Sequence, residues 1–348
     1  MTTALSDPVG LDVPFHARGP LSAAVLASPA GPPVDVDLLA LAQRVSLEAA
    51  DPLTDDDIQL SLFCLYAASY GLFPQIAPER EWDPGLIAAR RVLESAVESA
   101  LRVRVAAVPV PEPRRDSVAA ALFELTSEDA GPSLSRFIAK KATRDQVREF
   151  LIHRSVYTLR EADPHSWAIP RLTGAPKAAL VEIQSDEYGG GRADRVHATV
   201  FAKAMRGAGL DDDYGHYLDA IPAVTLASFN AMSMFGLNGR LIGAIVGHLA
   251  AFEMTSSIPN RLYGDGLRRL GYGEDVLDYF DEHVEADAVH EQIAGRDLAG
   301  SLAEERPELV ADIMFGAASC LLLDGAIGAH MLECWTAGAS SLRDGSPR

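Results

Sequence analysis

Residues 281–291 read DEHVEADAVHE and contain the motif His283-x-x-x-Asp287-x-x-His290. At ~100° per residue in an α-helix, these three side chains lie at about 0°, 40° and −20°, so they share one helix face. Two imidazoles and a carboxylate on one face suit iron, manganese or zinc. The alternative is a solvated acidic face, because other carboxylates flank the motif: Asp281, Glu282, Glu285 and Glu291. The spacing predicts a helix that is a candidate for metal binding.

Helical periodicity continues on both sides of this motif. Apolar residues repeat at helical spacing from Asp37 onward, and Thr143-x-x-Gln146 has the spacing of a capping box. The stretch 103–110 is ambiguous, and no other alternating run is long enough for a sheet. The sequence therefore predicts an all-α fold, a bundle of roughly ten helices. The main predicted helices are 55–70, 84–103, 117–125, 143–159, 178–187, 192–209, 216–235, 240–252, 264–270, 276–294 and 307–335.

Composition divides the chain into three predicted parts. Residues 1–35 are rich in Pro, Gly, Ser and Ala and are expected to form a flexible arm without an element. Residues 36–112 are expected to be accessory helices, and 106–114 is a Pro-rich linker. Residues 113–340 form the predicted main domain. An apolar face in the accessory helices predicts a homodimer surface, or else packing within the chain; it consists of Ile58, Leu62, Leu65 and Tyr66.

Charge and composition exclude several classes of function. A net charge of −19 argues against nucleic-acid and anionic-membrane partners. Charges break the apolar runs before the ~18 residues that a membrane span needs. No signal peptide is visible, and three scattered cysteines suit a reducing cytoplasm. Dinucleotide, ATP and serine-nucleophile motifs are absent from the sequence.

Further acidic residues and histidines are candidate ligands. Asp194-x-x-His197 and Asp287-x-x-His290 partly resemble the Glu-x-x-His pairs of ferritin-like diiron proteins. Glu253 follows an apolar stretch, so it is either a solvent group at a helix end or a buried ligand.

The remaining histidines and aromatic residues have simpler interpretations. His248 is expected in the core or behind a ligand, and His330-x-x-Glu333 is expected to have a packing role. Surface or capping positions are expected for His153, His165 and His216. Four aromatic residues line a substrate pocket or belong to the plain core: Tyr188, Phe201, Phe252 and Phe280.

Three segments resemble the haem-oxygenase-like diiron oxidases and oxygenases. They are LVEIQSDEYGGGRADRVHATVF at 180–201, GHLAAFEMTSSIP at 247–259 and YFDEHVEADAVHE at 279–291. The resemblance implies a haem-oxygenase-like helical bundle that holds two iron ions instead of haem. It also implies O2 as co-substrate, a small-molecule substrate, an external electron donor and a homodimer. The ligands it implies are Glu187, His197, Glu253, His283, Asp287 and His290.

A fourth segment, HRSVYTLREADPHSWAIPRLTG at 153–174, is similar to the N-oxygenase branch of that family. The resemblance implies that Glu161 is an additional ligand with a catalytic role in tuning the oxygen chemistry. Glu161 precedes Asp163-Pro164, where the chain must turn, so we expect its carboxylate to swing between solvent and metal. The alternative is a surface residue paired with Arg160 or Arg171. The resemblance does not include the cupin domain of that branch, so the rearrangement chemistry of that domain is not implied.

One distance is difficult for this ligand set. Ten residues of straight helix place Glu187 and His197 ~15 Å apart, near the limit for two adjacent metals. Gly189, Gly190 and Gly191 lie between them and are poor helix-interior residues. We expect the glycines to break the helix and bring Glu187 back. Without a break, Asp186 or Asp194 would replace it.

The predicted function is that of an O2-dependent non-haem diiron oxidoreductase acting on a small metabolite. The match around Glu161 favours N-oxygenation of an amino-acid-derived amine in specialised metabolism. One alternative is oxidative decarboxylation or desaturation of an amino or fatty acid. A ferritin-like protein that handles metal is another, and a helical interaction protein with surface carboxylates is a third.

Overall fold

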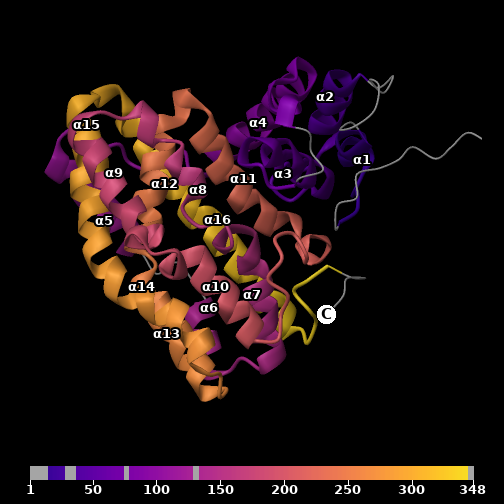
Figure 1. The fold of residues 1–348 in the computed structure, drawn as a ribbon. Coiled ribbons are helices and arrows are strands. Elements are labelled where there is room, and N and C mark those ends of the chain that lie inside the picture. The colour runs from indigo at the N-terminus through magenta and orange to yellow at the C-terminus, as the bar shows by residue number, and fades with distance from the viewer. Residues whose placement is uncertain (1–14, 28–36, 74–77, 128–132, 344–348) are drawn as a thin grey trace, which may run out of the picture. The chain divides into compact units, whose positions relative to one another are not determined.

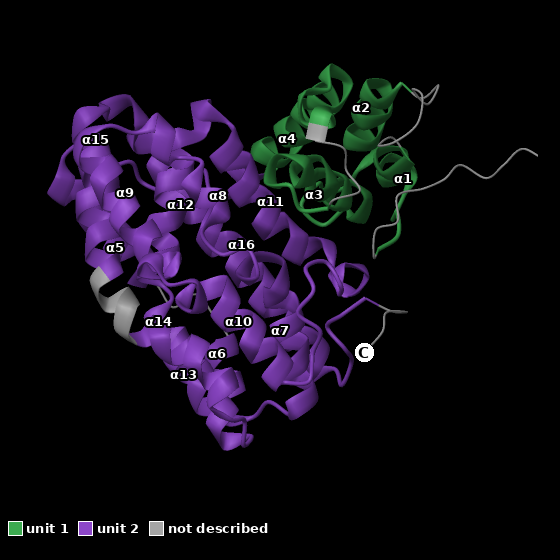
Figure 2. Cartoon of the chain, in the orientation of Figure 1, with its two compact units in different colours: residues 1–100 green, residues 101–348 purple. Residues whose placement is uncertain are grey.

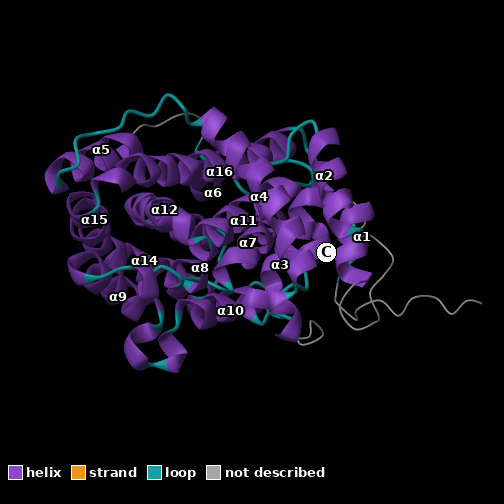
Figure 3. Ribbon diagram, turned by 90° about the horizontal axis from the view of Figure 1, so that it is seen from above, coloured by secondary structure: helices purple, strands orange, loops and turns teal. Residues whose placement is uncertain are grey.

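A computed structural model of the protein describes residues 15–27, 37–73, 78–127 and 133–343, except for the side chains of residues 78 and 285–289. Within these ranges the regular elements are helices and no strand occurs (Figures 1 and 3), which confirms the all-α prediction. The α-helices are α1 Pro20–Ala27, α2 Leu38–Glu48, α3 Asp56–Tyr70, α4 Pro84–Arg104, α5 Arg115–Ser127, α6 Leu134–Lys140, α7 Arg144–Thr158, α8 Asp163–Ser166, α9 Gly174–Glu187, α10 His197–Gly207, α11 Ala223–Leu237, α12 Ile242–Met254, α13 Ser257–Arg269, α14 Glu274–Gln292, α15 Ser301–Glu305 and α16 Val310–Thr336. Shorter 3-10 segments are η1 Pro78–Trp82, η2 Ile169–Arg171, η3 Gly189–Gly191, η4 Ala193–Arg195, η5 Leu218–Ala220, η6 Gly239–Leu241 and η8 Pro307–Leu309, and η7 Ile293–Gly300 is π-helical.

The chain divides into two compact units, Met1–Ala100 and Leu101–Arg348 (Figure 2). The division falls in the last turns of α4, before the segment 106–114 that was predicted as a linker. That segment is irregular. The ambiguous stretch 103–110 forms the end of α4 and a turn, not a strand.

In unit 1, α1 corrects the expectation that the Pro-rich arm holds no element. The backbone N–H groups of Leu21 and Ser22 donate to the Asp57 carboxylate at 2.9 and 2.7 Å. Leu21 is fully buried. A Cβ at Gly19 would lie 2.5 Å from Asp57 Cγ, so only glycine permits this approach. The capping carboxylate comes from α3, and no local pattern in the arm reveals it. The rest of the predicted arm, residues 1–14 and 28–35, lies outside the described residues.

The apolar face that motivated a homodimer is buried within the chain. The four residues concerned are 0 to 7% exposed: Ile58, Leu62, Leu65 and Tyr66. They are core residues and are not available to a second copy. A homodimer stays a prediction, and in unit 1 the exposed large apolar side chains include Leu47 and Trp82.

In unit 2, α12 is the central helix. It packs on α16, α11, α5, α14 and η7, and Figure 3 shows it end-on between α5 and α16 on one side and α9 and α14 on the other. Glycines let α12 and α16 touch backbone to backbone. A Cβ at Gly247 would lie 1.8 Å from the Ile313 carbonyl oxygen, and one at Gly316 would lie 1.9 Å from that of Ala244. This close crossing fixes α12, and therefore Glu253 near its end.

By length and composition, the helix Pro307–Thr336 could cross a membrane, as could the bent pair of α11 and α12 taken together. Of the most apolar 18-residue stretch of that helix, 56% is buried inside the protein. A core helix passes the same test, and α16 has the packing of one.

Several helix ends follow the sequence signals, and others do not: the predicted helix 264–270, for example, begins at Ser257. α7 begins at the predicted capping box, in which Thr143 and Gln146 bond each other's backbone N–H groups. The predicted helix 192–209 begins later, at His197, because a glycine turn precedes it. The predicted helix 216–235 also begins later, after Pro222, because the residues before it form turns and η5.

Candidate metal centre

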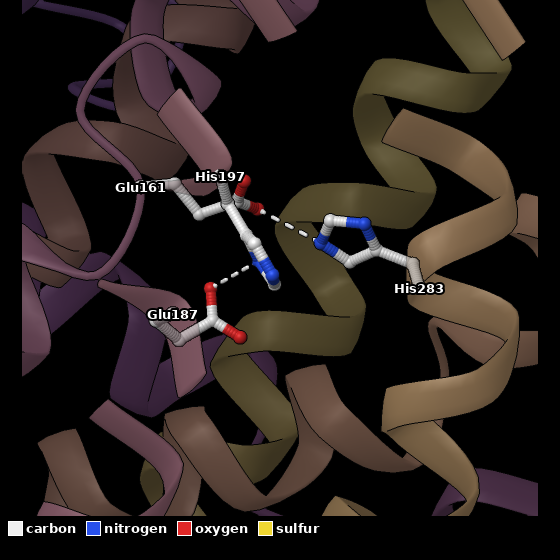
Figure 4. Close-up of side chains that lie close together, drawn as sticks. All are labelled: Glu161, Glu187, His197 and His283. Carbon is white, nitrogen blue, oxygen red and sulfur yellow. Dashed lines mark ion pairs between the residues drawn. The ribbon is translucent and has the colours of Figure 1, made fainter. Parts of the chain in front are cut away.

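α14 carries His283 and His290, the histidines of the predicted metal-binding motif. His283 Nδ1 donates to the backbone carbonyl of Tyr279 at 2.7 Å, one turn earlier. That bond fixes the ring and leaves Nε2 facing Glu161, whose Oε1 lies 3.8 Å away (Figure 4). The side chain of Asp287, the third residue of the motif, lies outside the described residues.

A glycine turn brings Glu187 and His197 together, as expected. α9 ends at Glu187, and φ is +76°, +57° and +85° at the three following glycines. A Cβ at Gly189 would lie 2.7 Å from the backbone of Arg195 and Val196, so glycine is required there. The chain folds back, and His197 Nδ1 lies 2.9 Å from Glu187 Oε2 (Figure 4).

Glu161 is buried in the turn after α7, where Ala162 has a left-handed φ of 72°. The Tyr279 hydroxyl donates to both Glu161 oxygens at 2.8 Å. The expectation of a carboxylate that swings into solvent is wrong for this state, because the side chain is only 4% exposed and held by Tyr279. The surface alternative is also wrong: Arg160 pairs with Asp163, and Arg171 binds backbone carbonyls.

The electrostatic surroundings of Glu161 favour its charged form. Burial by itself raises the pKa of this carboxyl. The nearby imidazole of His283, with the charges of His197 and Arg154, opposes burial and lowers the pKa below its ordinary value. Glu161 is therefore an ionised carboxylate, the form that binds a metal.

A second group of side chains lies beside the first. His290 Nδ1 is 3.3 Å from Glu253 Oε2, and its Nε2 is 3.1 Å from Asp186 Oδ2. Burial lowers the pKa of His290, but Glu253, Asp186 and Glu187 raise it to about 9. Glu253 is buried, which removes the alternative of a solvent group at the end of α12.

The predicted ligands thus form two groups that share Glu187. The first contains Glu161, Glu187, His197 and His283, and the second contains Glu187, Glu253 and His290. In each group the candidate ligand atoms lie within 4.8 Å of one another, and every residue is buried. A carboxylate common to two such groups is suited to bridge two cations.

The nitrogen and oxygen atoms of these groups are arranged as metal ligands would be, and not as hydrogen-bonded pairs. His197 Nδ1 and His290 Nδ1 are buried and make no hydrogen bond, although each has a carboxylate oxygen nearby. Such close but undirected contacts suit donor atoms that converge on a shared cation. Mixed imidazole and carboxylate donors suit iron.

Asp186 and Asp194, the two alternatives to Glu187 as a ligand, belong to neither ligand group. Asp186 contacts the outer nitrogen of His290, where it can orient the ring. Asp194 is exposed and belongs to neither group.

Two histidines predicted at the surface or at helix caps are buried instead. His165 Nε2 lies 3.2 Å from His248 Nδ1, and burial lowers the pKa of His165 to about 3. His153 lies between Thr225 and Ser341, at 2.8 and 3.1 Å. Their partners come from distant segments, so the local sequence gave no sign of burial.

The other histidines and the aromatic residues outside the ligand set are partly buried or belong to the core. His216 is partly exposed, and His330 donates to a backbone carbonyl, as a packing role requires. Phe201 and Phe280 are core residues, and Tyr188 is partly exposed. Sequence reasoning missed Tyr279, although its position four residues before His283 could have indicated a neighbour on the same helix face.

Comparison with known proteins identifies the family of this chain. The model of the iron-containing redox enzyme family matches residues 148–325, a range that includes every predicted ligand. The chain belongs to this family, as its sequence segments predicted. Nitrosourea synthase from Streptomyces achromogenes subsp. streptozoticus is 27% identical over 187 residues. The match covers 52% of this chain and 40% of that protein, so the chain spans well under half of the relative's length.

Proposed function

We propose that this protein is an O2-dependent non-haem diiron oxidoreductase acting on a small metabolite. The observation that carries the proposal is the pair of buried ligand groups joined at Glu187. Membership of the iron-containing redox enzyme family supports iron as the metal. A buried group of histidines and carboxylates gains little by pairing only with itself, because each ion loses solvation. Metal binding accounts for the arrangement.

In this proposal Glu161, His197 and His283 would hold one iron, Glu253 and His290 would hold the other, and Glu187 could serve either group. Asp287 remains a predicted ligand on the same helix face as His283 and His290. Bound iron supplies the redox chemistry with O2 that these side chains cannot supply themselves.

The chain positions the ligands and protects them from water. Tyr279 holds Glu161 with its hydroxyl and His283 with its carbonyl. Asp186 accepts the Nε2 hydrogen of His290, which directs Nδ1 to Glu253. The rings of Phe201 and Tyr279 pack edge to face, and both side chains are fully buried.

We propose N-oxygenation of an amino-acid-derived amine as the specific reaction. Support comes from the similarity to a nitrosourea synthase, whose name gives a product that contains oxidised nitrogen. Oxidative decarboxylation or desaturation would need the same metal pair.

The direct test is iron loading under anaerobic conditions, followed by elemental analysis and exposure to O2. We expect about two irons per chain and O2 uptake that increases when a substrate amine is added. Iron oxidation that no organic compound affects would favour a metal-handling protein. Failure to retain iron would overturn the proposal.

A further inference from the structure

Residues 133–148 are a basic stretch in an acidic chain. They contain five basic residues and one acidic residue, Asp145, whereas the whole chain has a formal net charge of −19. The stretch spans α6, the turn after it and the start of α7. α6 packs against α13 and α16, in the lower half of the view in Figure 1. A cluster of this sign contrasts with the negative field of the rest of the molecule.

The cations at the end of α6 are not neutralised by carboxylates. Lys140 and Lys141 are exposed, and neither has an ion-pair partner among the described residues. Two guanidinium groups beside them bond backbone carbonyls instead. Arg269 binds those at the end of α6 at 2.7 to 3.0 Å, and Arg144 binds those that follow α13 at 2.7 and 3.2 Å. A carbonyl carries no net charge, so these four residues, here called the basic corner, keep their positive charge.

Another arginine-rich stretch, residues 102–115, differs in this respect. Arg102, Arg114 and Arg115 each pair with a carboxylate of the chain. The charge of that stretch is largely balanced from within. The basic corner therefore offers an acidic partner something that residues 102–115 do not.

A groove of about 760 Å³ opens beside the basic corner, between α6 and the end of α16. Its lining includes Arg136, Lys140 and Lys141, with Glu333 as the one acidic residue among the lining side chains. Phe137 adds an apolar ring to the wall. Three cations against one anion attract acidic side chains, and the volume admits more than one of them.

The wall of this groove is connected to the interior of the protein. The Phe137 ring stacks on that of Trp335 with centroids 5.8 Å apart. Trp335 is buried, and its Nε1 donates to the Glu149 carboxylate at 2.7 Å. The next residue in α7 is Phe150, which is also buried. Stacking, one hydrogen bond and one step along the backbone thus lead from the groove to Phe150.

Two further rings lead from Phe150 to a predicted metal ligand. The centroids of Phe150 and Phe280 are 6.4 Å apart, and those of Phe280 and Tyr279 are 5.2 Å apart. The Tyr279 ring lies 4.3 Å from the His283 ring, which belongs to the first ligand group. Electron tunnelling slows steeply with distance and is faster through packed atoms than across gaps. The groove is therefore a part of the surface that continuous packing joins to the candidate centre.

We propose that this groove, together with the basic corner, is the docking site of a small acidic one-electron carrier protein. The inference rests on the proposed function, because it names the partner that supplies electrons to the same centre. In each transfer the carrier loses one electron and is oxidised, and one ferric ion of the proposed centre gains that electron and becomes ferrous. No atom is exchanged in this step.

The charge distribution favours a compact acidic protein over a nucleic acid. A carrier that is smaller than this chain can meet the basic corner while its remaining surface faces solvent. A long polyanion would extend beyond the corner onto a surface that is negative overall. Repulsion elsewhere and attraction at one corner would also fix the orientation in which the carrier arrives.

The first test measures binding of the full-length, iron-free protein to a plant-type [2Fe–2S] ferredoxin, an acidic carrier. The double variant Lys140→Glu/Lys141→Glu should lower the association rate at low salt by about tenfold or more. The difference from wild type should shrink as salt is added, because exposed charges are screened. Surface plasmon resonance over a series of salt concentrations measures both effects.

The chain contains a matched control. Its other two lysines are Lys177 in α9 and Lys203 in α10. Lys177→Glu/Lys203→Glu changes the net charge of the protein by the same amount as the first double variant, but at another place. The control should bind ferredoxin at close to the wild-type rate. An equal loss in both double variants would show that only net charge matters and would overturn the proposal.

The second test uses the iron-loaded, oxidised protein. Reduced ferredoxin is mixed with it anaerobically, and ferredoxin oxidation is followed by absorbance. Lys140→Glu/Lys141→Glu should slow this reaction as much as it slows binding. Reduction by dithionite, a small reagent that needs no docking surface, should stay close to the wild-type rate. If both reductants are slowed equally, the lysines act on the centre and not on docking, and the proposal is wrong.

The outcomes separate this inference from the proposed function. Iron retention without ferredoxin binding overturns the docking site alone, and ferredoxin binding at the lysines without iron retention overturns the function alone. Tighter binding of a short DNA duplex than of ferredoxin at the same lysines would assign the surface to nucleic acid and overturn the proposal. If the charge reversal prevents folding, as seen in the thermal transition, Lys140→Ala/Lys141→Ala replaces it, with a smaller loss expected in the same direction.

Discussion

The two ligand groups share Glu187 but differ in the residues that hold them. In the first group, Tyr279 supports two ligands at once: its hydroxyl bonds Glu161 and its carbonyl accepts from His283. Tyr279 is fully buried. In the second group, His290 is oriented by Asp186, whose side chain is 59% exposed. The first group is thus supported from inside the core, and the second from the surface.

This difference has a consequence for metal affinity. A ligand held by a buried partner keeps its orientation without metal, whereas one held by an exposed carboxylate can rotate or exchange that bond with water. Residues behind the ligands commonly change metal affinity by about 10–100-fold. We therefore expect the first group to bind its metal more tightly than the second.

The largest effect should come from the shared residue. Glu187→Ala removes a donor from both groups, so we expect loss of most of the iron that wild type retains. Glu182→Ala is the matched control, since Glu182 is an exposed glutamate on the same helix, α9. Elemental analysis after desalting measures the effect. Wild-type iron content in Glu187→Ala would show that the two groups do not share a ligand.

The next prediction separates the two groups. His290→Ala leaves the first group complete, so about one iron should remain and resist a competing chelator. His283→Ala leaves the second group complete, and we expect its remaining iron to be removed by the same chelator. The measurement is iron content before and after the chelator. If the iron left in His283→Ala resists the chelator better than the iron left in His290→Ala, the first group is not the more firmly supported one.

A smaller effect is expected at Asp186. Asp186→Asn weakens the bond that orients His290 but keeps a similar shape, and should weaken the second metal by about 10–100-fold without affecting the first. Asp194→Asn is the control, because Asp194 is exposed, lies in η4 shortly after α9 and belongs to neither group. Competition titrations with a metal indicator resolve the two affinities. If the tighter of the two affinities changes instead, Asp186 acts on the first ligand group, and the prediction is wrong.

These variants also show which parts of the site the sequence could reveal. The spacing of His283 and His290 follows from helix geometry alone, and three consecutive glycines indicate a break wherever they occur. The resemblance then assigned Glu187 and Glu253. The residues that orient the ligands, Asp186 and Tyr279, could not be predicted in the same way. Asp186 reaches His290 across 104 positions, and Tyr279 reaches Glu161 across 118. Such contacts depend on how helices pack, which no single segment encodes.

The fold shows the same limit. Helices with strong periodicity, such as α3 and α4, were predicted to within one residue at each end. α1 was missed because the carboxylate that caps it belongs to α3. His153 and His165 were predicted at the surface or at helix caps, whereas they are buried against partners from α11 and α12.

The smallest effect on iron content is expected at Tyr279, although this residue supports the first group most directly. Tyr279→Phe removes the hydroxyl but keeps the ring and the backbone carbonyl that holds His283. Glu161 then lacks its hydrogen bonds in a buried position, so the free energy of unfolding of the iron-free protein should fall by about 1–3 kcal/mol. Iron content should stay close to wild type, because no donor atom is lost. Urea denaturation measures the stability, and Tyr263→Phe, another deeply placed tyrosine, is the control. If both variants are equally stable, the bonds between Tyr279 and Glu161 do not stabilise the metal-free site, and the first group is not supported from inside the core.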